Sequence, residues 1–342
     1  MRTNQIRLAA YPVGEPKDSD FKFTTEELPE LGEGQVLLRA IYLSLDPYMR
    51  GRMSTAKSYA QPLSIGDVML GGTVCEVLES RSDKRHAGDI VLAFTGWQTH
   101  AVADAQHTRR LDPAAAPIST ALGVLGMPGF TAYGGLLEIG RPKPGETVAV
   151  AAAAGPVGSA VGQIAKIHGA RAVGIAGGPE KCRILIDEFG FDAAVDHRSQ
   201  TFEDDLASAT PDGVDVYFEN VGGHVASAVT RRLNRFARIP VCGLVAGYND
   251  TETPTGVDRL PGFMRRVLTL SLTVRGFIQD EFIPTHQDAF LNDMPGWVRD
   301  VSVRYREDIV DGLDNAPEAF RGLLRGRNLG KLLIRVGEDP TN

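Results

Sequence analysis

The stretch TVAVAAAAGPVGSAVGQIAKIH, residues 147–168, decides the fold of this chain. It begins with a short apolar run of strand length (147–154), continues through a glycine-containing turn (155–158), and then repeats apolar residues at helical spacing. A buried strand that turns directly into a helix is the first half of a dinucleotide-binding βαβ unit. In such a unit the pyrophosphate binds the N–H groups and the positive dipole end at the start of the helix.

The residues of the turn have separate expected roles. Gly155 and Gly158, with Pro156 and Val157 between them, allow a tight turn and let backbone N–H groups approach a pyrophosphate. Gly162 lies one helical turn further on and is expected to let the helix lie against the strand. The spacing departs from G-x-G-x-x-G, and a glycine turn between a strand and a helix is often only a connection.

Strands and helices continue to alternate after this turn, as a doubly wound parallel sheet requires. Further strands are expected at 170–176, 192–196, 214–220, 237–242 and 272–277, with helices at 180–189, 202–209 and 225–233. Six short strands in this alternation favour a nucleotide-binding sheet over a mere connection. The predicted fold class is therefore α/β, with a Rossmann-type parallel sheet.

The regions on either side of this sheet have a different pattern. Residues 4–125 are mostly β, with strands expected at 5–9, 34–45, 71–78, 89–93 and 100–102, and a helix ending near 139 should follow. Helices at 284–301 and 316–324 and a closing strand at 331–336 are expected near the C-terminus. The loop 250–262, with two prolines, could be a flap beside a substrate or an inert connection.

Length, charge and cysteine usage exclude several classes of protein. A chain of 342 residues predicts two domains, and its net charge of −7 argues against a general nucleic-acid-binding surface. Its three cysteines are far apart and match no C-x-x-C site, which indicates reduced thiols. The uncharged stretch 113–137 contains three prolines and five glycines, so we expect buried turns and short helices rather than a membrane span. The N-terminus lacks the apolar core of a signal peptide, and we expect a cytoplasmic protein.

The end of the second strand of the sheet indicates the cofactor. NAD-binding sheets place an Asp or Glu there for the ribose 2′-hydroxyl, whereas this chain has glycines, including Gly178. Lys181 follows, and His197 and Arg198 come after the third strand, which should lie alongside. Without a carboxylate and with cations nearby, this position suits a 2′-phosphate and hence NADPH. The alternative is that Lys181 and Arg198 are solvated surface charges.

The chain resembles a known family at several places along nearly its whole length. It is similar to the zinc-free medium-chain dehydrogenase/reductases of the leukotriene B4 12-hydroxydehydrogenase/prostaglandin reductase branch, in particular the bacterial NADPH-dependent curcumin reductase type. The matching segments are YLSLDPYMRGRM (42–53), GVLGMPGFTAY (123–133), AAAAGPVGSAVGQIAK (151–166), AGGPEKCR (176–183), FENVGG (218–223), ARIPVCGLVAGYN (237–249) and NLGKLLIR (328–335).

This resemblance implies a domain organisation and an activity. A GroES-like β domain should be built from residues 1–125 and 305–342, with a Rossmann domain at 126–304 between them, usually in a homodimer. The expected reaction is NADPH-dependent reduction of the carbon–carbon double bond of α,β-unsaturated ketones and aldehydes. Quinone reduction, or NADPH binding without turnover, remain alternatives. The cysteines and histidines of zinc-dependent relatives are missing, and Asp46 falls in the region of the first catalytic ligand, so no metal is expected.

The resemblance also assigns site residues. Tyr248 is expected to donate a hydrogen bond to the substrate oxygen as that atom gains charge, although a tyrosine can also simply pack a loop. Tyr48 and Tyr59 are expected to form walls of the substrate pocket, with packing as the equal alternative. Where the family usually has a tyrosine after the third strand, this chain has His197. Further cofactor contacts are expected from Met127, Thr131, Asn220, Gly222, Cys242 and Asn328.

Overall fold

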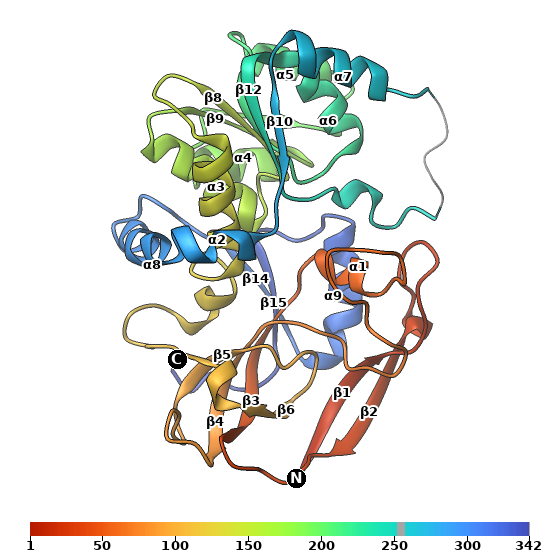
Figure 1. Ribbon diagram of the computed structural model, residues 1–342, viewed down its shortest axis with the longest axis vertical. Helices are drawn as coiled ribbons and strands as arrows, with labels where there is room; N and C mark the ends of the chain where they lie inside the picture. The colour runs from red at the N-terminus through yellow and green to blue at the C-terminus, as the bar shows by residue number, and fades with distance from the viewer. Residues whose placement is uncertain (252–256, 342) are drawn as a thin grey trace. The chain divides into compact units, whose positions relative to one another are not determined.

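A computed structural model describes residues 1–251 and 257–341 of the chain (Figure 1). The chain divides into two compact units, the first made of Met1–Gly123 and Glu307–Asn342 and the second of Val124–Arg306. Each unit has its own sheet and its own hydrophobic core. Within the described part of the chain, no helix combines the length and apolar character needed to cross a membrane.

The second unit is built on one six-stranded parallel sheet in the order β10-β9-β8-β11-β12-β13. Its strands are β8 (Thr147–Ala151), β9 (Arg171–Ala176), β10 (Ala193–Asp196), β11 (Val214–Phe218), β12 (Leu233–Val241) and β13 (Thr273–Gly276). The chain starts at the centre with β8, runs outward to β10, and crosses back to β11. The order therefore reverses between β8 and β11, and ligands of such sheets bind at the carboxyl ends of the strands at this point.

Helices connect and cover these strands. They are α2 (Met127–Gly134), the π-helical η4 (Gly135–Gly140), α3 (Pro156–Ile167), α4 (Pro179–Asp187), α5 (Phe202–Ala209), α6 (Gly223–Val229), α7 (Leu260–Thr269) and α8 (Ile283–Arg299). Helix α3 packs on β8 and β9, and α4 on β9 and β10 (Figure 1). The core between the sheet and its helices consists of small and branched apolar side chains, which let the layers approach closely.

Two sequence predictions in this unit are corrected. The helix predicted at 225–233 consists of α6 and a following 3-10 turn, η5 (Thr230–Arg232), and it stops before Leu233, which is a buried residue of β12 and pairs with Val214. The predicted loop 250–262 ends in a helix, since α7 begins at Leu260. The remainder of that prediction falls partly on residues 252–256, which lie outside the described residues.

The first unit contains a mixed sheet in the order β14-β15-β3-β4-β5-β7, with β6 paired to β3. Its strands are β3 (Gln35–Ser44), β4 (Thr73–Ser80), β5 (Ile90–Ala93), β6 (His100–Asp104), β7 (Arg109–Arg110), β14 (Glu307–Asp311) and β15 (Lys331–Arg335). A second sheet pairs β1 (Arg2–Leu8) with β2 (Phe21–Glu27), and the helices are α1 (Tyr48–Arg52) and α9 (Ala316–Leu324). The closing strand β15 runs antiparallel to β3 and so ties the C-terminal segment into the β unit. Of these strands, β2, β7 and β14 have no counterpart in the sequence prediction.

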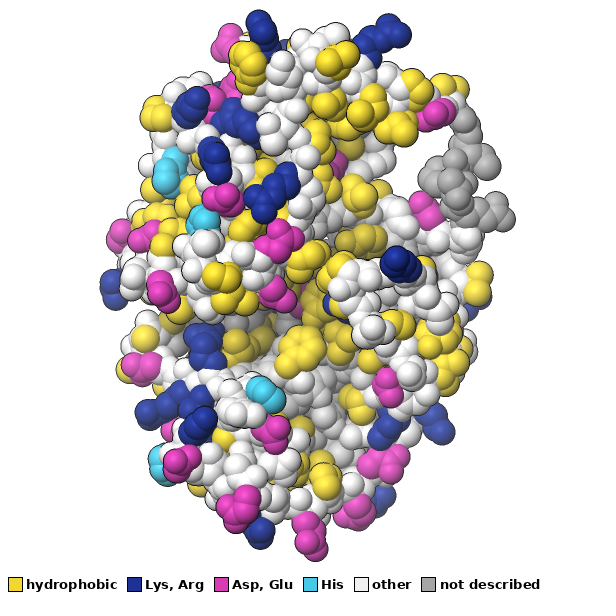
Figure 2. Space-filling view, in the orientation of Figure 1, with side chains coloured by type: hydrophobic (Ala, Val, Ile, Leu, Met, Phe, Trp, Pro, Cys, Tyr) yellow, Lys and Arg dark blue, Asp and Glu magenta, His cyan; other side chains and the backbone are white. Residues whose placement is uncertain are grey.

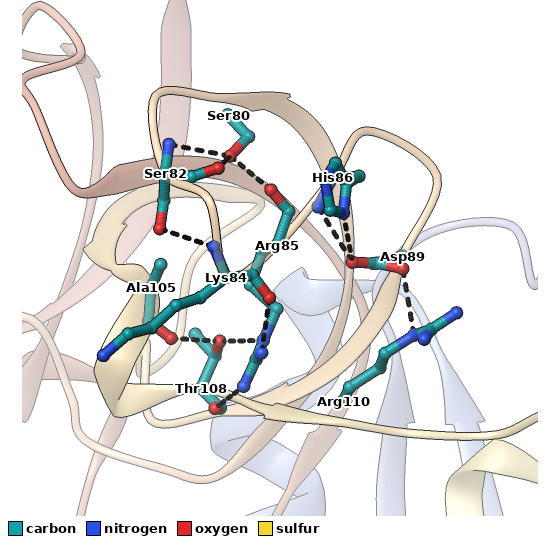
Figure 3. A network of polar contacts seen from close by, with 9 residues as sticks. All are labelled: Ser80, Ser82, Lys84, Arg85, His86, Asp89, Ala105, Thr108 and Arg110. Atoms are coloured by element: carbon teal, nitrogen blue, oxygen red, sulfur yellow. Dashed lines mark hydrogen bonds and ion pairs between the residues drawn. The ribbon is translucent and has the colours of Figure 1, made fainter.

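A network of polar contacts holds the β4–β5 connection against the segment before β7 (Figure 3). The guanidinium of Arg85 donates to the hydroxyl of Thr108 over 2.9 Å and also to the Thr108 carbonyl. Ser80 donates to the Arg85 carbonyl over 2.6 Å, and Arg110 contacts the carboxylate of Asp89 at 3.0 Å. The guanidinium groups of Arg85 and Arg110 therefore make structural contacts within this unit.

Candidate functional site

The turn between β8 and α3 is tight and depends on one glycine. Gly155 caps the helix and Pro156 is its first residue. A Cβ atom on Gly158 would lie 2.5 Å from the carbonyl oxygen of Ala152 and 2.7 Å from the Cα of Ala153. Because no real Cβ approaches backbone this closely, only glycine lets α3 begin directly against the turn. The helix N-terminus is thereby held at the carboxyl end of β8.

The other two glycines of this segment do different things. Gly155 has an extended backbone with φ of −81°, so its conformation does not require glycine. Gly162 was expected to let α3 lie against its strand, but its missing Cβ makes room for the ring of Phe191, whose Cζ would be 1.9 Å away. The contact that Gly162 accommodates is therefore with an aromatic ring in the loop before β10, not with the strand.

Asn220 connects the two central strands where the strand order reverses. Its side-chain amide Nδ2 donates to the carbonyl oxygen of Ala151, the last residue of β8, over 2.8 Å. Gly222 caps α6 with a φ of 80°, a conformation that favours glycine. The structure thus places Asn220 and Gly222 at the carboxyl ends of β8 and β11, beside the turn that carries Gly155 and Gly158.

Glu219 is a site residue that the sequence reasoning missed. Its side chain is 4% exposed, and its carboxylate accepts hydrogen bonds from the N–H groups of Val221 at 2.6 Å and Gly222 at 2.9 Å. The hydroxyl of Tyr217 donates to its other oxygen over 2.9 Å. Burial raises the pKa of this carboxyl, and the three donors counteract that rise. Glu219 therefore holds the backbone of the Asn220–Gly222 turn through these hydrogen bonds. Only its burial in the structure indicates this role.

Cationic side chains gather over the glycines that follow β9, as the sequence predicted. A Cβ on Gly177 would lie 2.8 Å from Nε of Arg198 and 2.9 Å from Nε2 of His197. Asp196, at the end of β10, accepts hydrogen bonds from the backbone N–H groups of Gly178 at 2.8 Å and Arg198 at 2.9 Å. Burial opposes the ionisation of Asp196, but these donors and the neighbouring cations hold its pKa below the usual range. The Asp196 carboxylate therefore holds together the loop after β9 and the loop after β10 by accepting their backbone N–H groups.

A second histidine lies beside His197. The ring of His224, on α6, is 5.3 Å from the ring of His197, and its Nε2 is 3.2 Å from the His197 carbonyl oxygen. Nδ1 of His197 is buried and has no hydrogen-bond partner among the residues that the structure describes. Burial, His224 and Arg198 lower the pKa of His197. The sequence offered no signal for His224, because it comes from a different helix.

Lys181 is placed on the first turn of α4. That helix starts at Pro179, directly after Gly178, whose φ of 98° favours glycine. Lys181 is partly buried. Gly178 and Lys181 thus follow β9, on the same loop–helix junction that carries Gly177.

Tyr248 lines a cavity of about 420 Å³ at the carboxyl ends of β12 and β13. The cavity is lined by Val241, Cys242, Gly243, Leu244, Tyr248, Gly276, Phe277, Ile278 and Glu281. The Tyr248 hydroxyl lies next to Gly243, where a Cβ would be only 3.3 Å from it. Burial, reinforced by the charge of Glu219, raises the pKa of the Cys242 thiol to about 12. The cavity therefore offers a phenol and a thiol that stays protonated.

Met127 and Thr131 lie one helical turn apart on α2. The hydroxyl of Thr131 donates to the Met127 carbonyl oxygen over 2.7 Å, while the Met127 side chain is 36% exposed. Helix α2 packs against α3 within the same unit. Of the two, Met127 has an accessible side chain, whereas the Thr131 hydroxyl is bonded to the backbone of its own helix.

In the first unit, Arg52 brings Tyr48 and Tyr59 together. Its guanidinium carbon lies 5.8 Å from the centre of the Tyr48 ring and 4.7 Å from that of Tyr59. Burial raises the pKa of the half-buried Tyr48, and the charge of Asp46 adds to the rise. Two aromatic faces joined by a cation form a surface that can stack on a flat conjugated molecule.

Asp46 is held by a buried ion pair. Its Oδ1 accepts from Nζ of Lys331 at 2.7 Å, and the side chains are 3% exposed for Lys331 and 7% for Asp46. Nζ of Lys331 also donates to the Leu45 carbonyl oxygen over 2.8 Å, and Ser44 donates to the other carboxylate oxygen. Among the residues described, no group of three or more His, Cys, Asp or Glu side chains could hold a metal ion.

Asn328 precedes the closing strand of the first unit. Its amide Nδ2 donates to the carbonyl oxygen of Gly330 over 2.7 Å, which stabilises the turn into β15. The Leu329 N–H donates to Asp308 over 3.2 Å. The side chain of Asn328 thus has a structural contact in addition to the cofactor contact that the resemblance implies.

Comparisons with known proteins agree along the whole chain. Residues 4–111 match the family model described as the N-terminal domain of oxidoreductase, and residues 156–287 match that of zinc-binding dehydrogenase. The chain is 52% identical over 340 residues to the NADPH-dependent curcumin reductase of Escherichia coli (strain K12), covering 99% of this chain and 98% of that protein. It is 42% identical over 340 residues to prostaglandin reductase 1 of Sus scrofa, covering 98% and 100%.

A solved structure gives the same result. The crystal structure of CurA in complex with NADPH from Vibrio vulnificus matches with a TM-score of 0.95 and 48% sequence identity, covering 99% of this chain and 100% of that chain.

Proposed function

Because this chain belongs to the curcumin reductase and prostaglandin reductase branch of the medium-chain dehydrogenase/reductase family, we propose that it reduces the carbon–carbon double bond of α,β-unsaturated ketones and aldehydes with NADPH. The observation that carries the proposal is the 52% identity over 99% of the chain to an NADPH-dependent curcumin reductase. Curcumin-like enones and alkenals are the proposed substrate class.

The residues present fit NADPH. The N-terminus of α3 would hold the pyrophosphate, through the backbone of Gly155, Pro156, Val157 and Gly158. The buried, partnerless Nδ1 of His197 and the guanidinium of Arg198 next to it suit a 2′-phosphate, with Lys181 on the adjoining helix. The nearby carboxylate of Asp196 accepts backbone N–H groups of Gly178 and Arg198 through its Oδ1. We propose Met127, Thr131, Asn220, Gly222, Cys242 and Asn328 as further cofactor contacts.

When bound, NADPH supplies a hydride to the β-carbon of the enone. The proposed task of Tyr248 is to donate its phenolic hydrogen bond to the substrate carbonyl oxygen, which gains negative charge during the reaction. The phenolic O–H group of a tyrosine is a hydrogen-bond donor and can therefore act in this way. The lining of the Tyr248 cavity is mostly apolar and includes Phe277 and Ile278.

The first unit is proposed to bind the substrate and the second to bind NADPH. This keeps the division into a GroES-like domain (1–125 and 305–342) and a Rossmann domain (126–304). In the first unit, Tyr48 and Tyr59 are the proposed substrate walls, and Arg52 fixes the two rings relative to each other. Flat conjugated substrates gain most from such a surface.

A substrate panel tests the proposal. Purified protein is mixed with NADPH and an alkenal, a quinone or a curcumin-like diarylheptanoid, and cofactor absorbance and products are followed. A saturated ketone or aldehyde as product supports enone reduction. Turnover of the quinone alone would favour the alternative of a quinone oxidoreductase, and tight NADPH binding without any turnover would favour a non-catalytic binding protein.

The assembly is proposed to be a homodimer in the cytoplasm. Strand β13 is the last strand of its sheet, and all four of its residues are exposed. The preceding helix α7 exposes Leu260 (61%), Met264 (53%) and Leu268 (80%), and Figure 2 shows hydrophobic side chains gathered in this region. An exposed strand edge beside apolar side chains is suited to pairing with a second copy. Light scattering tests this, and Leu268→Glu should shift a dimer towards monomers.

A further inference from the structure

We infer that His197 and His224 together make NADPH binding take up a proton, with His197 facing the 2′-phosphate and His224 tuning it as a positioning residue. This inference rests on the proposed cofactor. It adds a residue, His224, and a pH dependence that the proposed function does not include.

The first step is the position of His197. Its Nε2 and the guanidinium of Arg198 both lie over Gly177, at the end of β9, where an adenosine ribose would be read. Its buried Nδ1 has no hydrogen-bond partner among the described residues. A buried polar atom without a partner costs free energy, and a phosphate oxygen would satisfy it once the ring is protonated. In the cofactor-free protein, His197 therefore has a buried ring nitrogen that lacks a hydrogen-bond partner among the described residues.

The second step is the contact with His224. The two rings lie 5.3 Å apart and tilted by 47°, and Nε2 of His224 is 3.2 Å from the His197 carbonyl oxygen. The ring of Phe202, on α5, packs edge-on against His224 and fixes its orientation. Two imidazolium ions at this separation repel each other, so the free protein favours a neutral His197.

The third step is the balance of charge around the pair. Groups that act on His197 are His224 from α6 and Arg198, which favour its neutral form, and Asp196, which favours its cationic form. Burial has the largest effect and also favours the neutral form. Burial, His224 and Arg198 together hold the pKa of His197 below its usual value. A dianionic phosphate brought beside the ring reverses this balance. His197 is then protonated as the cofactor binds, and the affinity for NADPH rises as the pH falls from the pKa of His197 in the bound state to its lower pKa in the free protein.

Calorimetry of the intact protein at pH 7.0, in two buffers with different ionisation heats, counts the protons exchanged on NADPH binding. The unmodified protein should take up about half a proton or more. The 2′-phosphate has a second pKa near 6 and would instead release a proton when it meets the cations. The sign of the measured proton exchange therefore separates titration of His197 from titration of the phosphate. NADH lacks the 2′-phosphate and should bind with no uptake.

Variants identify the residues responsible. His197→Gln keeps an amide for hydrogen bonding and should abolish the uptake. His224→Gln removes a group that lowers the pKa of His197 and should move the pH of greatest uptake upwards. His168→Gln, at the exposed end of α3, is the matched control and should leave the uptake unchanged. Equal uptake by His197→Gln and the unmodified protein would overturn the inference. NADPH binding without proton uptake would also overturn it and leave the proposed function intact, whereas a failure to bind NADPH would refute the proposed cofactor itself.

Discussion

The amide Nδ2 of Asn220 donates to the carbonyl oxygen of Ala151 over 2.8 Å and so joins the ends of the two central strands, β11 and β8. The turns that start α3 and α6 follow these two strand ends. The bond thus fixes the spacing of the backbone that we propose to hold the cofactor.

Removal of this bond should weaken cofactor binding. Asn220→Ala leaves the Ala151 carbonyl without that donor and lets the two turns separate, at a cost of about 1 kcal/mol. We expect Kd for NADPH and for NADH to rise by similar factors, about fivefold each, in calorimetric titrations. A loss confined to NADPH would contradict this role, because Asn220 is not assigned to the 2′-phosphate.

Gly158 should tolerate no side chain. Gly158→Ala would bring a Cβ to 2.5 Å from the Ala152 carbonyl oxygen, and the start of α3 would have to move. We expect a loss of about 1–3 kcal/mol in the free energy of unfolding, together with weaker NADPH binding. Gly296→Ala is the matched control, since Gly296 lies inside α8 with nothing within 4 Å. That change should raise stability by up to about 1 kcal/mol, and thermal unfolding of both variants measures the contrast.

Much of the second unit could be predicted from the sequence, because its signals are local. The apolar strand, the glycine turn and the amphipathic helix at 147–167 are contiguous, and the residues after β9 and β10 follow from the strand order. The end of the helix predicted through Leu233 was wrong by one residue, because Leu233 pairs with Val214 in the sheet. Glu219 and His224 were missed since their importance comes from burial and from a neighbouring element, neither of which a linear pattern records.

The buried ion pair between Asp46 and Lys331 should be costly to break. Lys331→Met leaves a carboxylate that is 7% exposed without its cation, and we expect a loss of roughly 3–5 kcal/mol in the free energy of unfolding. The double variant Asp46→Leu/Lys331→Met removes both charges and should recover much of the loss. Chemical denaturation measures both, and equal stability of the single variant and the unmodified protein would show that the pair contributes nothing.

Tyr248→Phe should separate binding from turnover. The variant keeps the ring that lines the cavity but loses the hydroxyl beside Gly243, so NADPH affinity should be unchanged. We expect kcat for an enone to fall by roughly 10²- to 10³-fold, as for loss of one donor to a developing oxyanion. Tyr133→Phe is the matched control, because the Tyr133 hydroxyl donates to Asp293 over 2.6 Å and has no assigned role in catalysis. Unchanged turnover in Tyr248→Phe would remove this residue from the mechanism.

The most direct test of the account compares NADPH with NADH as the reductant of a single enone. The account predicts that the saturated ketone or aldehyde is formed and that kcat/KM with NADPH exceeds that with NADH by roughly 10²- to 10⁴-fold, from two charge-assisted bonds to the 2′-phosphate. Equal efficiency with the two cofactors, or oxidation of NADPH without a saturated product, would contradict it.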